Sequence, residues 1–523
     1  MSGIVELRGQ VHPHRPALRL RAGLLLLLMS LAACTVGPDY EPPDLTTTVP
    51  DQWHSAVETE MTADTTDLEM WWLTFNDSLL TDLIRRAEFG NLDLQAAVGR
   101  VAEARAIRGI ASGKYWPDIV LGGAYNYQKI SENGLTGAAN SQPDDGGDGG
   151  GNPLLEDPID SWVFGLDMRW EIDLFGRIRR TVEASDAQLQ ASVEDYRDVL
   201  VTLYAEVGSA YVDARAFQTR LDFAQQNVES QRNSLELTRD RFNAGLTSAL
   251  DVAQAEQNLA QTESTIPSLE IGLEASLNRL AVLLGDAPGA LHEELQAYTG
   301  LPEPDDKIAY GIPADLLRRR PDIRQSERLL ASQTARIGIA TADLYPTLSL
   351  GGSIGMEALD FEDLAKGSSL FWSLVPQISW PIFTGGKIQN RIRAEEARTQ
   401  QALAAYEQTV LGALEEVQNA LVAYGQEKQR KDRLLEAVHA SQRAVDLVET
   451  QYVSGLTNFQ NFLDAQRSLF RQQDELAQSA GQVVNNLITL NRSLGGGWAP
   501  GQAGVTAAAA AGETPPPPVG GDR

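Results

Sequence analysis

WVFGLDMRW at residues 162–170 and WSLVPQISW at residues 372–380 decide the fold of this 523-residue chain. Each stretch begins and ends with tryptophan, and large apolar side chains occupy every second position between them. A period of two is typical of a β-strand with one apolar face. Residues 119–127 and 348–356 alternate in the same way, so each tryptophan-bounded strand has a predicted partner upstream.

The spacing of these tryptophans indicates a membrane. Trp162 and Trp170 lie eight residues apart on one face, as do Trp372 and Trp380. Eight strand residues rise roughly 26 Å, or about 20 Å at a tilt of about 40°, which is near the height of the apolar band between two aromatic girdles. The alternative is a soluble hairpin whose tryptophans fill a core.

Four strands cannot close a transmembrane barrel, because an open edge in lipid leaves backbone groups unpaired. If the strands are membrane strands, the chain must pair with copies of itself. Two, three or four copies would give about eight, twelve or sixteen strands, and the strands by themselves do not choose between these numbers.

Long helices follow each predicted pair of strands. From Val182 to Phe242, apolar residues recur at steps of three or four, which is typical of a coiled-coil seam. Gly245 and Gly455 follow the two longest helical patterns, where a left-handed conformation is needed to end a helix. We expect a return helix after each glycine, and a kink at Pro267 in the first of them.

The same plan occurs twice along the chain. Gly245-Leu-Thr and Gly455-Leu-Thr lie 210 residues apart, which predicts two structural repeats. The expected organisation is a signal peptide at 1–33, a lipidated N-terminal tether at 34–70, a first repeat at 71–285 (strands 117–128 and 161–174, long helices 177–243 and 248–284), a linker at 286–312, a second repeat at 313–494 (strands 346–356 and 371–382, long helices 386–453 and 458–494) and a disordered tail at 495–523.

The N-terminus has the order of a secretory signal: basic residues, the short apolar run Leu24–Leu28, then Ala32 and Ala33. The run is far shorter than the roughly 20 residues that span a bilayer, so we expect it to be cleaved. The following Cys34 completes Leu-Ala-Ala-Cys, which resembles a bacterial lipobox. This resemblance implies that Cys34 is acylated, and Thr35 in place of aspartate implies sorting to the outer membrane.

Composition excludes several classes of function. The chain has 43 basic and 71 acidic residues and a net charge of −28, which argues against nucleic-acid binding. One cysteine and five histidines leave no cluster for a structural metal, so no cofactor is expected. Calcium binding in the outer loop by Asp144, Asp145 and Asp148 is an alternative to a simple solvated loop, although no EF-hand spacing occurs there.

Several separated motifs carry a family resemblance. The lipobox, the duplicated plan, RRRPDIRQSE at 318–327 and FLDAQRSL at 462–469 together resemble the TolC/OprM family of outer-membrane efflux channels, in its lipoprotein, NodT-like branch that serves RND pumps. The resemblance implies a mostly α chain with a four-stranded membrane β segment. It also implies a homotrimer whose 12-stranded β-barrel, embedded in outer-membrane lipid, continues as a periplasmic α-helical barrel.

The resemblance also implies partners and a function. The channel would be a passive conduit that carries drugs or toxic compounds from an inner-membrane RND-type pump and a periplasmic membrane-fusion adaptor to the exterior. The turns that match the family's adaptor-contacting tips are Ala244, Gly245, Leu246 and Thr247 in the first repeat and Ser454, Gly455, Leu456 and Thr457 in the second.

The resemblance places a periplasmic gate beside these turns. Asp464 falls where the family often has a ring of carboxylates, whose mutual repulsion would favour cations. Asn461 stands where some members have a second aspartate. Asp251 follows the first turn and is the weaker candidate, expected to pair with an arginine of a neighbouring helix.

Three other functions compete with efflux. Gly351-Gly-Ser353-Ile-Gly355 fits a hydrolase pattern, but Ser353 lies in a predicted strand and His439 on a predicted helix, so no enzyme is expected. A lipid-tethered periplasmic coiled coil would need no barrel. The third alternative is the outer-membrane channel of an ABC-driven protein export system.

Overall fold

The computed structural model describes residues 35–44, 49–50, 52–54, 61–62, 68–129, 131, 158–297, 300–302, 308–309, 316 and 319–498. The predicted signal peptide, Cys34 and the loop aspartates Asp144, Asp145 and Asp148 lie outside these residues. No helix in the described ranges is both long and apolar enough to cross a membrane.

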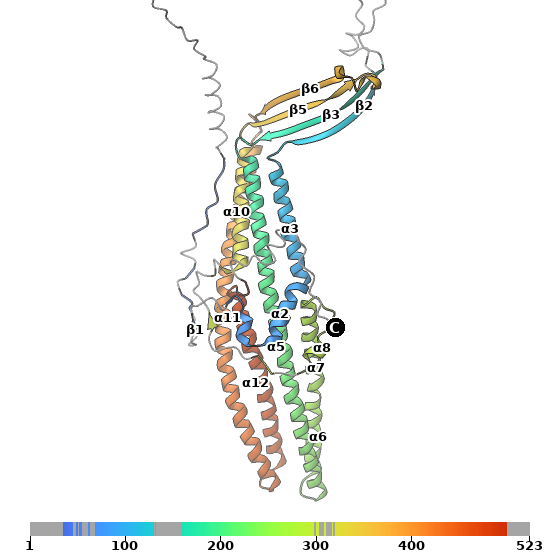
Figure 1. Ribbon diagram of the computed structural model, residues 1–523. Coiled ribbons are helices and arrows are strands. Elements are labelled where there is room, and N and C mark those ends of the chain that lie inside the picture. The colour runs from blue at the N-terminus through green and yellow to red at the C-terminus, as the bar shows by residue number, and fades with distance from the viewer. Residues whose placement is uncertain are drawn as a thin grey trace, which may run out of the picture. The chain divides into compact units, whose positions relative to one another are not determined.

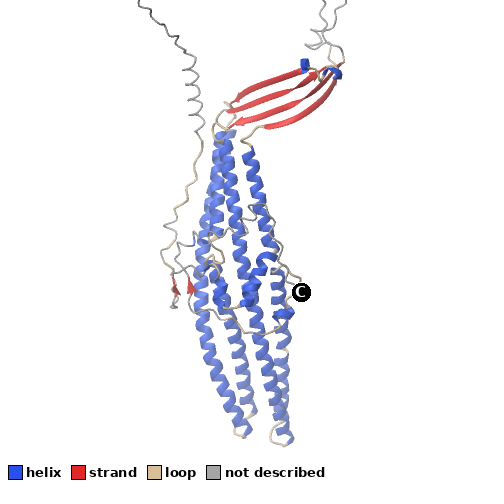
Figure 2. Ribbon diagram, in the orientation of Figure 1, coloured by secondary structure: helices blue, strands red, loops and turns tan. Residues whose placement is uncertain are grey.

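The described chain is mostly helical with one four-stranded sheet, as predicted (Figures 1 and 2). The α-helices are α2 (Ser78–Gly90), α3 (Leu92–Gly113), α5 (Arg177–Asn243), α6 (Ala249–Glu263), α7 (Thr265–Leu283), α8 (His292–Leu295), α10 (Pro321–Ala342), α11 (Lys387–Val453) and α12 (Phe459–Ser493). Short 3₁₀ turns are η2 (Trp71–Phe75), η3 (Phe361–Asp363) and η4 (Gly367–Ser369).

Contacts divide the chain into two compact units that do not coincide with the two sequence repeats. The first unit falls within Met1–Glu41, Ala106–Ala187 and Ala331–Gln400, and the second within Pro42–Arg105, Gln188–Leu330 and Gln401–Arg523. Each unit therefore combines segments of both repeats, and α5 and α11 contribute residues to both units.

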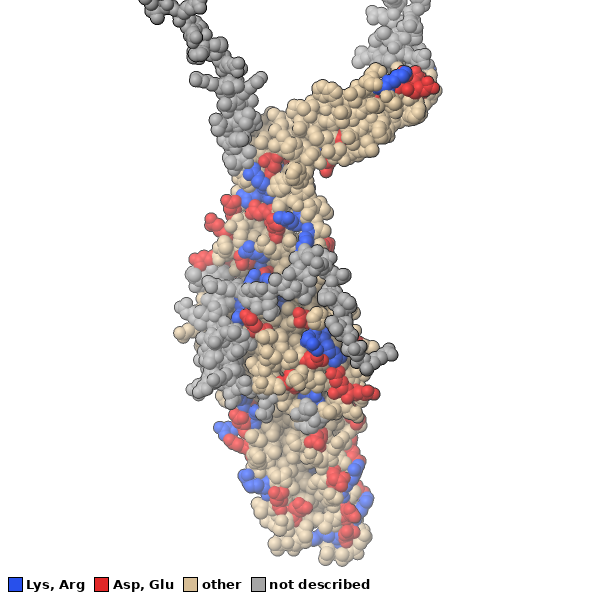
Figure 3. Space-filling view, viewed as in Figure 1, with Lys and Arg blue, Asp and Glu red and all other residues tan. Residues whose placement is uncertain are grey.

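The sheet of the first unit is antiparallel, with strand order β2-β3-β5-β6. Its strands are β2 (Asp118–Gln128), β3 (Ile159–Ile172), β5 (Thr347–Ala358) and β6 (Leu370–Ser379). Tyr125 lies opposite Trp162, and Ile354 lies opposite Trp372. Since side chains alternate along a strand, this register places the predicted apolar residues of all four strands on one face. Figure 3 shows few charged side chains on the visible part of the sheet.

Two tryptophans make the same contact in the two repeats. The Trp170 indole Nε1 donates to the Tyr115 carbonyl at 3.0 Å, and the Trp380 Nε1 donates to the Leu344 carbonyl at 3.0 Å. Both acceptors lie in the short connection between a helix and the first strand of a hairpin. The indole therefore has a polar partner at the strand end, as tryptophans at a membrane–water interface commonly do.

The first return helix is broken rather than merely kinked. α6 ends at Glu263, Ser264 separates the two helices, and α7 begins at Thr265. Pro267 has no N–H, and its ring would clash with the carbonyl of Glu263 four residues earlier in a continuous helix. The break therefore falls three residues before the proline itself.

The structure changes two expectations about irregular segments. The range expected as a linker contains α8 and strand β4 (Ile308–Ala309), which pairs in parallel with β1 (Met61–Thr62). The range expected as a disordered tail begins in ordered chain, because the Trp498 side chain is buried. Its indole Nε1 donates to the Arg319 carbonyl at 3.1 Å, and its ring lies 4.6 Å from the Arg197 guanidinium carbon.

Candidate functional site

Two matched turns connect the long helices to their return helices. Gly245 has φ +70° and Gly455 has φ +71°, a conformation that glycine adopts without the strain of a side chain. Leu246 N donates to the Arg241 carbonyl at 2.8 Å, and Leu456 N donates to the Gln451 carbonyl at 2.8 Å. These six-residue bonds around a left-handed glycine form a Schellman motif in each repeat. The predicted C-cap role of both glycines is confirmed.

A leucine protrudes from each turn. Leu246 is 67% exposed and Leu456 is 79% exposed, and each follows the glycine directly. The other residues expected to dock an adaptor are exposed or half-buried: Ala244, Gly245 and Thr247 in the first turn, and Ser454, Gly455 and Thr457 in the second. Each turn thus presents one apolar side chain on a polar, solvent-facing loop.

The helix after each turn begins with a side-chain cap. In the first repeat, Ser248 Oγ accepts from Asp251 N at 3.3 Å, and Asp251 Oδ2 accepts from Ser248 N at 3.2 Å. Asp251 Oδ2 also accepts from the Thr247 hydroxyl. This reciprocal arrangement is a capping box. Among the described residues Asp251 thus caps its own helix, and no arginine of a neighbouring helix pairs with it as expected.

The second repeat reproduces this cap with amides. Asn458 Oδ1 accepts from Asn461 N at 3.0 Å, and Asn461 Nδ2 donates to Thr457 Oγ1 at 2.9 Å. Asn461 lies 210 residues after Asp251, so the two residues occupy equivalent positions. Both candidates are therefore engaged in local structure at the start of a helix.

Asp464 differs from these two because it is available to solvent. It lies on the exposed face of α12, where Gln460 Nε2 donates to Asp464 Oδ1 at 2.9 Å within the same helix. Its neighbours Phe462 and Leu463 are buried on the opposite side. The packing of α12 thus fixes the direction in which the Asp464 carboxylate points.

An aromatic cluster supports the turns from inside. Tyr452 and Phe462 stack with centroids 5.6 Å apart and an interplanar angle of 12°, and Phe459 lies 5.6 Å from Tyr452. The buried cluster continues through Leu235 of α5 and Ala255 of α6. Both helical hairpins therefore share one apolar core at this end of the second unit.

Arg241 joins the two hairpins at their turns. Its Nη1 donates to the Val453 carbonyl at 2.9 Å, and its guanidinium lies 4.8 Å from the centroid of the Tyr452 ring. The equivalent residue of the second repeat is Gln451, so this contact exists in one direction only. Sequence reasoning missed Arg241 because nothing in a heptad pattern distinguishes it from other helix-surface arginines.

The RRRPDI motif acquires a physical role in the structure. The buried Arg320 donates from Nε and Nη2 to the two oxygens of Asp322 at 3.0 and 2.7 Å. Its Nη1 also donates to Glu416 Oε2 at 2.8 Å and to the Ser493 carbonyl at 3.0 Å. Arg320 therefore ties the start of α10 to α11 and to the end of α12.

A small cavity of about 250 Å³ adjoins this arginine and is lined in part by Asp198. Burial, with a smaller contribution from the nearby Asp322 charge, raises the pKa of Asp198 to about 6. This acidic group lies within the second unit, and its partners are structural, so we assign it no chemistry.

The segment that follows Cys34 is docked rather than free. Val36 N donates to the Phe175 carbonyl at 3.2 Å, and Arg180 Nη2 donates to Asp39 Oδ1 at 2.7 Å. A Cβ on Gly37, which has φ +89°, would lie 2.4 Å from the Gly338 Cα. The tether predicted for this range thus begins with residues packed on the first unit.

The hydrolase-like serine does not form a nucleophile elbow. Ser353 lies in the middle of β5, and its Oγ is 2.6 Å from the Ser373 Oγ on β6. A strand-to-helix turn, which that motif requires, is not present at this residue.

The family of the chain follows from its sequence once this geometry is known. The model of the family described as "Outer membrane efflux protein" matches residues 83–286 and 312–496. The chain belongs to the outer membrane efflux protein family. The resemblance to TolC/OprM-type channels is thereby confirmed.

Relatives of this efflux protein are similar over nearly their whole length. Nodulation protein T of Rhizobium leguminosarum bv. trifolii is 32% identical over 472 residues, which cover 90% of this chain and 96% of the relative. Outer membrane protein OprJ of Pseudomonas aeruginosa is 32% identical over 498 residues, covering 94% and 98%. The solved structure of the outer-membrane channel OprN has a TM-score of 0.81 at 36% identity, covering 89% of this chain and all of that chain.

These findings confirm the predicted location and general function. The efflux protein resides in the outer membrane and is the outer-membrane component of an efflux system. Its family is one of channels rather than enzymes.

Proposed function

We propose that three copies of this efflux protein form a passive conduit that receives small molecules from a periplasmic adaptor and an inner-membrane RND-type pump. The matched pair of turns at Gly245 and Gly455 carries the proposal. Both have the same backbone hydrogen bonds and both expose a leucine, so three copies would present six similar docking points. The chain supplies no chemistry and no energy in this scheme.

The turns are suited to docking because their backbone is already ordered. The Schellman bonds and the caps at Ser248 and Asn458 fix the loops on both sides. A partner that covers Leu246 and Leu456 therefore orders little additional chain, and it removes apolar surface from water.

The gate is assigned to Asp464 in this proposal. It is the exposed acid of α12 whose carboxylate is held by one glutamine and not by a helix cap. Three symmetric copies would place three carboxylates around one axis, which favours cations and resists anions. Asn461 and Asp251 stabilise the helix starts beside this ring.

The membrane contacts complete the proposal. The apolar face of the sheet would meet lipid, and Trp162, Trp170, Trp372 and Trp380 would form its aromatic girdles. The acyl chains on Cys34 would add an anchor of roughly 0.8 kcal/mol per buried CH₂.

Efflux in cells tests the docking assignment. A strain that lacks its own outer-membrane channel would carry the full-length protein with a matching adaptor and pump, and drug tolerance would be measured. The double variant Leu246→Ser/Leu456→Ser should lose tolerance. The matched control Leu447→Ser changes a leucine that is 65% exposed on α11 and should retain it. Equal tolerance in the two variants would contradict docking at the turns.

Two measurements on purified protein test the conduit itself. The detergent-corrected mass of a Cys34→Ser variant, exported with a cleavable signal, should equal three chains. In a planar bilayer, Asp464→Asn should lower the preference for cations over anions. A monomeric mass would contradict the trimer, and an unchanged ion preference would remove Asp464 from the gate.

A further inference from the structure

The two edge strands of the sheet lack a neighbour on one side. Among the described residues, β2 pairs only with β3, and β6 pairs only with β5 (Figure 1). In lipid, each unpaired backbone group costs several kcal/mol, so both edges require a partner. The trimer proposed above provides one, and the inference below rests on it.

The repeats show how such a partner would align. Pro117, Leu121 and Gly122 of β2 and its approach correspond to residues 229 positions later, Pro346, Leu350 and Gly351. Trp162 and Trp170 of β3 correspond to residues 210 positions later, Trp372 and Trp380 of β6. β5 is therefore the repeat of β2, and β6 is the repeat of β3.

The register of the two hairpins confirms this correspondence. Leu121 lies opposite Leu166 in the first hairpin. Their counterparts, Leu350 and Pro376, lie opposite each other in the second. The two hairpins thus have the same alignment, residue for residue.

The seam between the hairpins then serves as a template. β3 and β5 pair with Trp170 opposite Leu350 and Arg169 opposite Gly351. In repeat terms, the second strand of one repeat pairs with the first strand of the next repeat. The strand that would follow β6 in this order is β2, supplied by a second copy of the chain.

We propose that β6 of one copy pairs antiparallel with β2 of the next, with Trp380 opposite Leu121 and Ser379 opposite Gly122 in the adjoining copy. These pairs are the counterparts of Trp170–Leu350 and Arg169–Gly351. The same alignment places Ile382 opposite Ile119 of the next copy.

This register keeps the apolar face continuous across the seam. Trp380 and Leu121 belong to the apolar face of their strands, and Ser379 and Gly122 belong to the other face. A slip of one residue would turn one apolar row away from lipid, so only slips of two residues compete.

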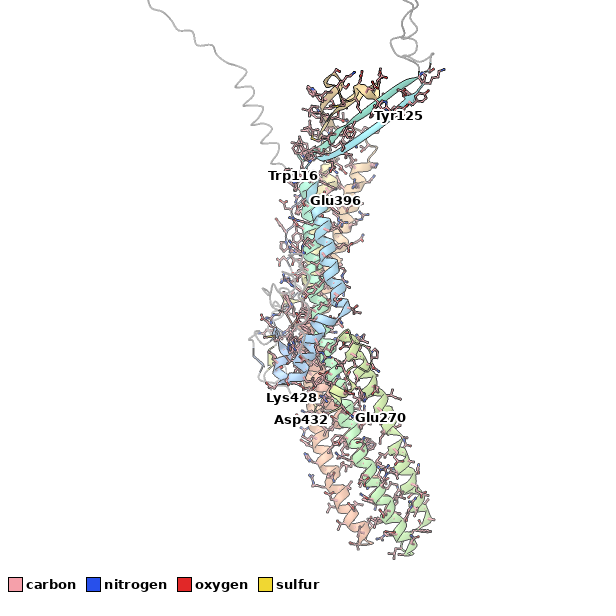
Figure 4. All side chains as sticks on the ribbon, turned by 45° about the vertical axis from the view of Figure 1, so that its right-hand side comes forward. Trp116, Tyr125, Glu270, Glu396, Lys428 and Asp432 are labelled. Carbon is pink, nitrogen blue, oxygen red and sulfur yellow. The ribbon has the colours of Figure 1, made fainter. Side chains whose placement is uncertain are left out.

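Exposed aromatic groups mark the same seam. Within one copy, Tyr345, which precedes β5, stacks on Phe175 of the loop after β3 at 4.8 Å. Its counterpart Trp116, which precedes β2, is 75% exposed (Figure 4). The loop after β6 contains Phe383, which is 92% exposed. In the proposed seam the loop of one copy covers Trp116 of the next.

Disulfide trapping tests the register in the assembled protein. In a Cys34→Ser background, Ser379→Cys/Gly122→Cys should give a reducible interchain bond, because directly opposite Cα atoms lie about 4.5–5.5 Å apart. A Cβ on Gly122 meets no atom within 4 Å, so this substitution is sterically free. The matched controls are Ser379→Cys/Val120→Cys and Ser379→Cys/Ala124→Cys. Their diagonal partners lie about 7–8 Å away, at the limit for a disulfide.

The expected result is at least a fivefold higher yield of interchain bond for the Gly122 pair than for either control on non-reducing gels. Arg169→Cys/Gly351→Cys, the template pair, should instead form a bond within one chain. Each variant must first show the mass of the parent under reducing conditions. Stronger trapping by a control pair, or no trapping by the Gly122 pair, in a protein of three-chain mass would overturn the register while leaving the trimer intact. A monomeric parent would overturn the trimer itself.

Discussion

Replacing Arg241 with alanine should loosen the contact between the two helical hairpins at their turns. The guanidinium donates to the Val453 carbonyl at 2.9 Å and lies 4.8 Å from the Tyr452 ring centroid. Arg241 belongs to α5, and both of its partners belong to α11. The substitution therefore removes a link between hairpins and leaves the Schellman turn that follows it, which uses the Arg241 backbone carbonyl.

The magnitude follows from these two contacts. A hydrogen bond from a charged donor contributes about 1.5–3 kcal/mol, and a cation–π contact about 0.5–2 kcal/mol. Arg241 is half-buried, and its Nε has no acceptor among the described residues, so the lower ends of both ranges apply. The sum is about 2 kcal/mol, which is roughly a 30-fold change in an equilibrium between joined and separated turns.

Single-channel recording measures this equilibrium if the joined turns correspond to the closed conduit. The open probability of Arg241→Ala should rise by up to about 30-fold at a fixed voltage. Arg239→Ala is the matched control. Arg239 lies two residues earlier on α5, but it pairs with Glu256 of its own hairpin at 2.6 Å. Its removal changes the charge equally without cutting the link to α11.

One result would refute this reasoning. If Arg241→Ala and Arg239→Ala both opened as rarely as the unchanged protein, the contact with Val453 and Tyr452 would not hold the turns together. Tyr452→Phe provides a second check, because it retains the ring beneath the guanidinium and removes a hydroxyl without a partner among the described residues. Its open probability should stay within about threefold of that of the unchanged protein.

Three further predictions concern the body of the protein. Because burial raises the Asp198 pKa to about 6, its ionisation opposes folding, and the unfolding free energy should fall by up to about 3 kcal/mol as pH rises from 4 to 8; Asp198→Asn should abolish this fall in thermal denaturation at several pH values. Arg320→Lys keeps the charge but loses the paired bonds to Asp322, and should cost about 3 kcal/mol, seen as a lower thermal midpoint. Gly37→Ala places a Cβ 2.4 Å from the Gly338 Cα at φ +89°, so hydrogen exchange at residues 35–39 should accelerate while the sheet remains protected.

The sheet was largely predictable because its signal is local. Alternation of large apolar residues gave the four strands and their faces, and the measured register agrees with those faces. Helix ends were predictable where glycine was required, at Gly245 and Gly455. The Pro267 break was placed slightly wrong, because the steric effect of proline acts on the turn before it.

The candidate site was predictable only in outline. The motifs indicated the turns and Asp464, but they did not reveal that Asp251 and Asn461 cap helices, since a cap depends on backbone geometry. Arg241 and Arg320 were not recognised as structural links, because their partners lie in helices more than 90 residues away in sequence.

By itself, the sequence determined the secondary structure, the apolar face of the sheet and the duplicated plan, because these depend on periodicity and on single residues such as glycine. Only the tertiary structure decided which residues of the two repeats join in each compact unit, how residues 35–39 dock, and that Trp498 is buried. These features depend on contacts between distant segments, and a guanidinium or an indole has no preferred partner until folding brings one within hydrogen-bonding distance.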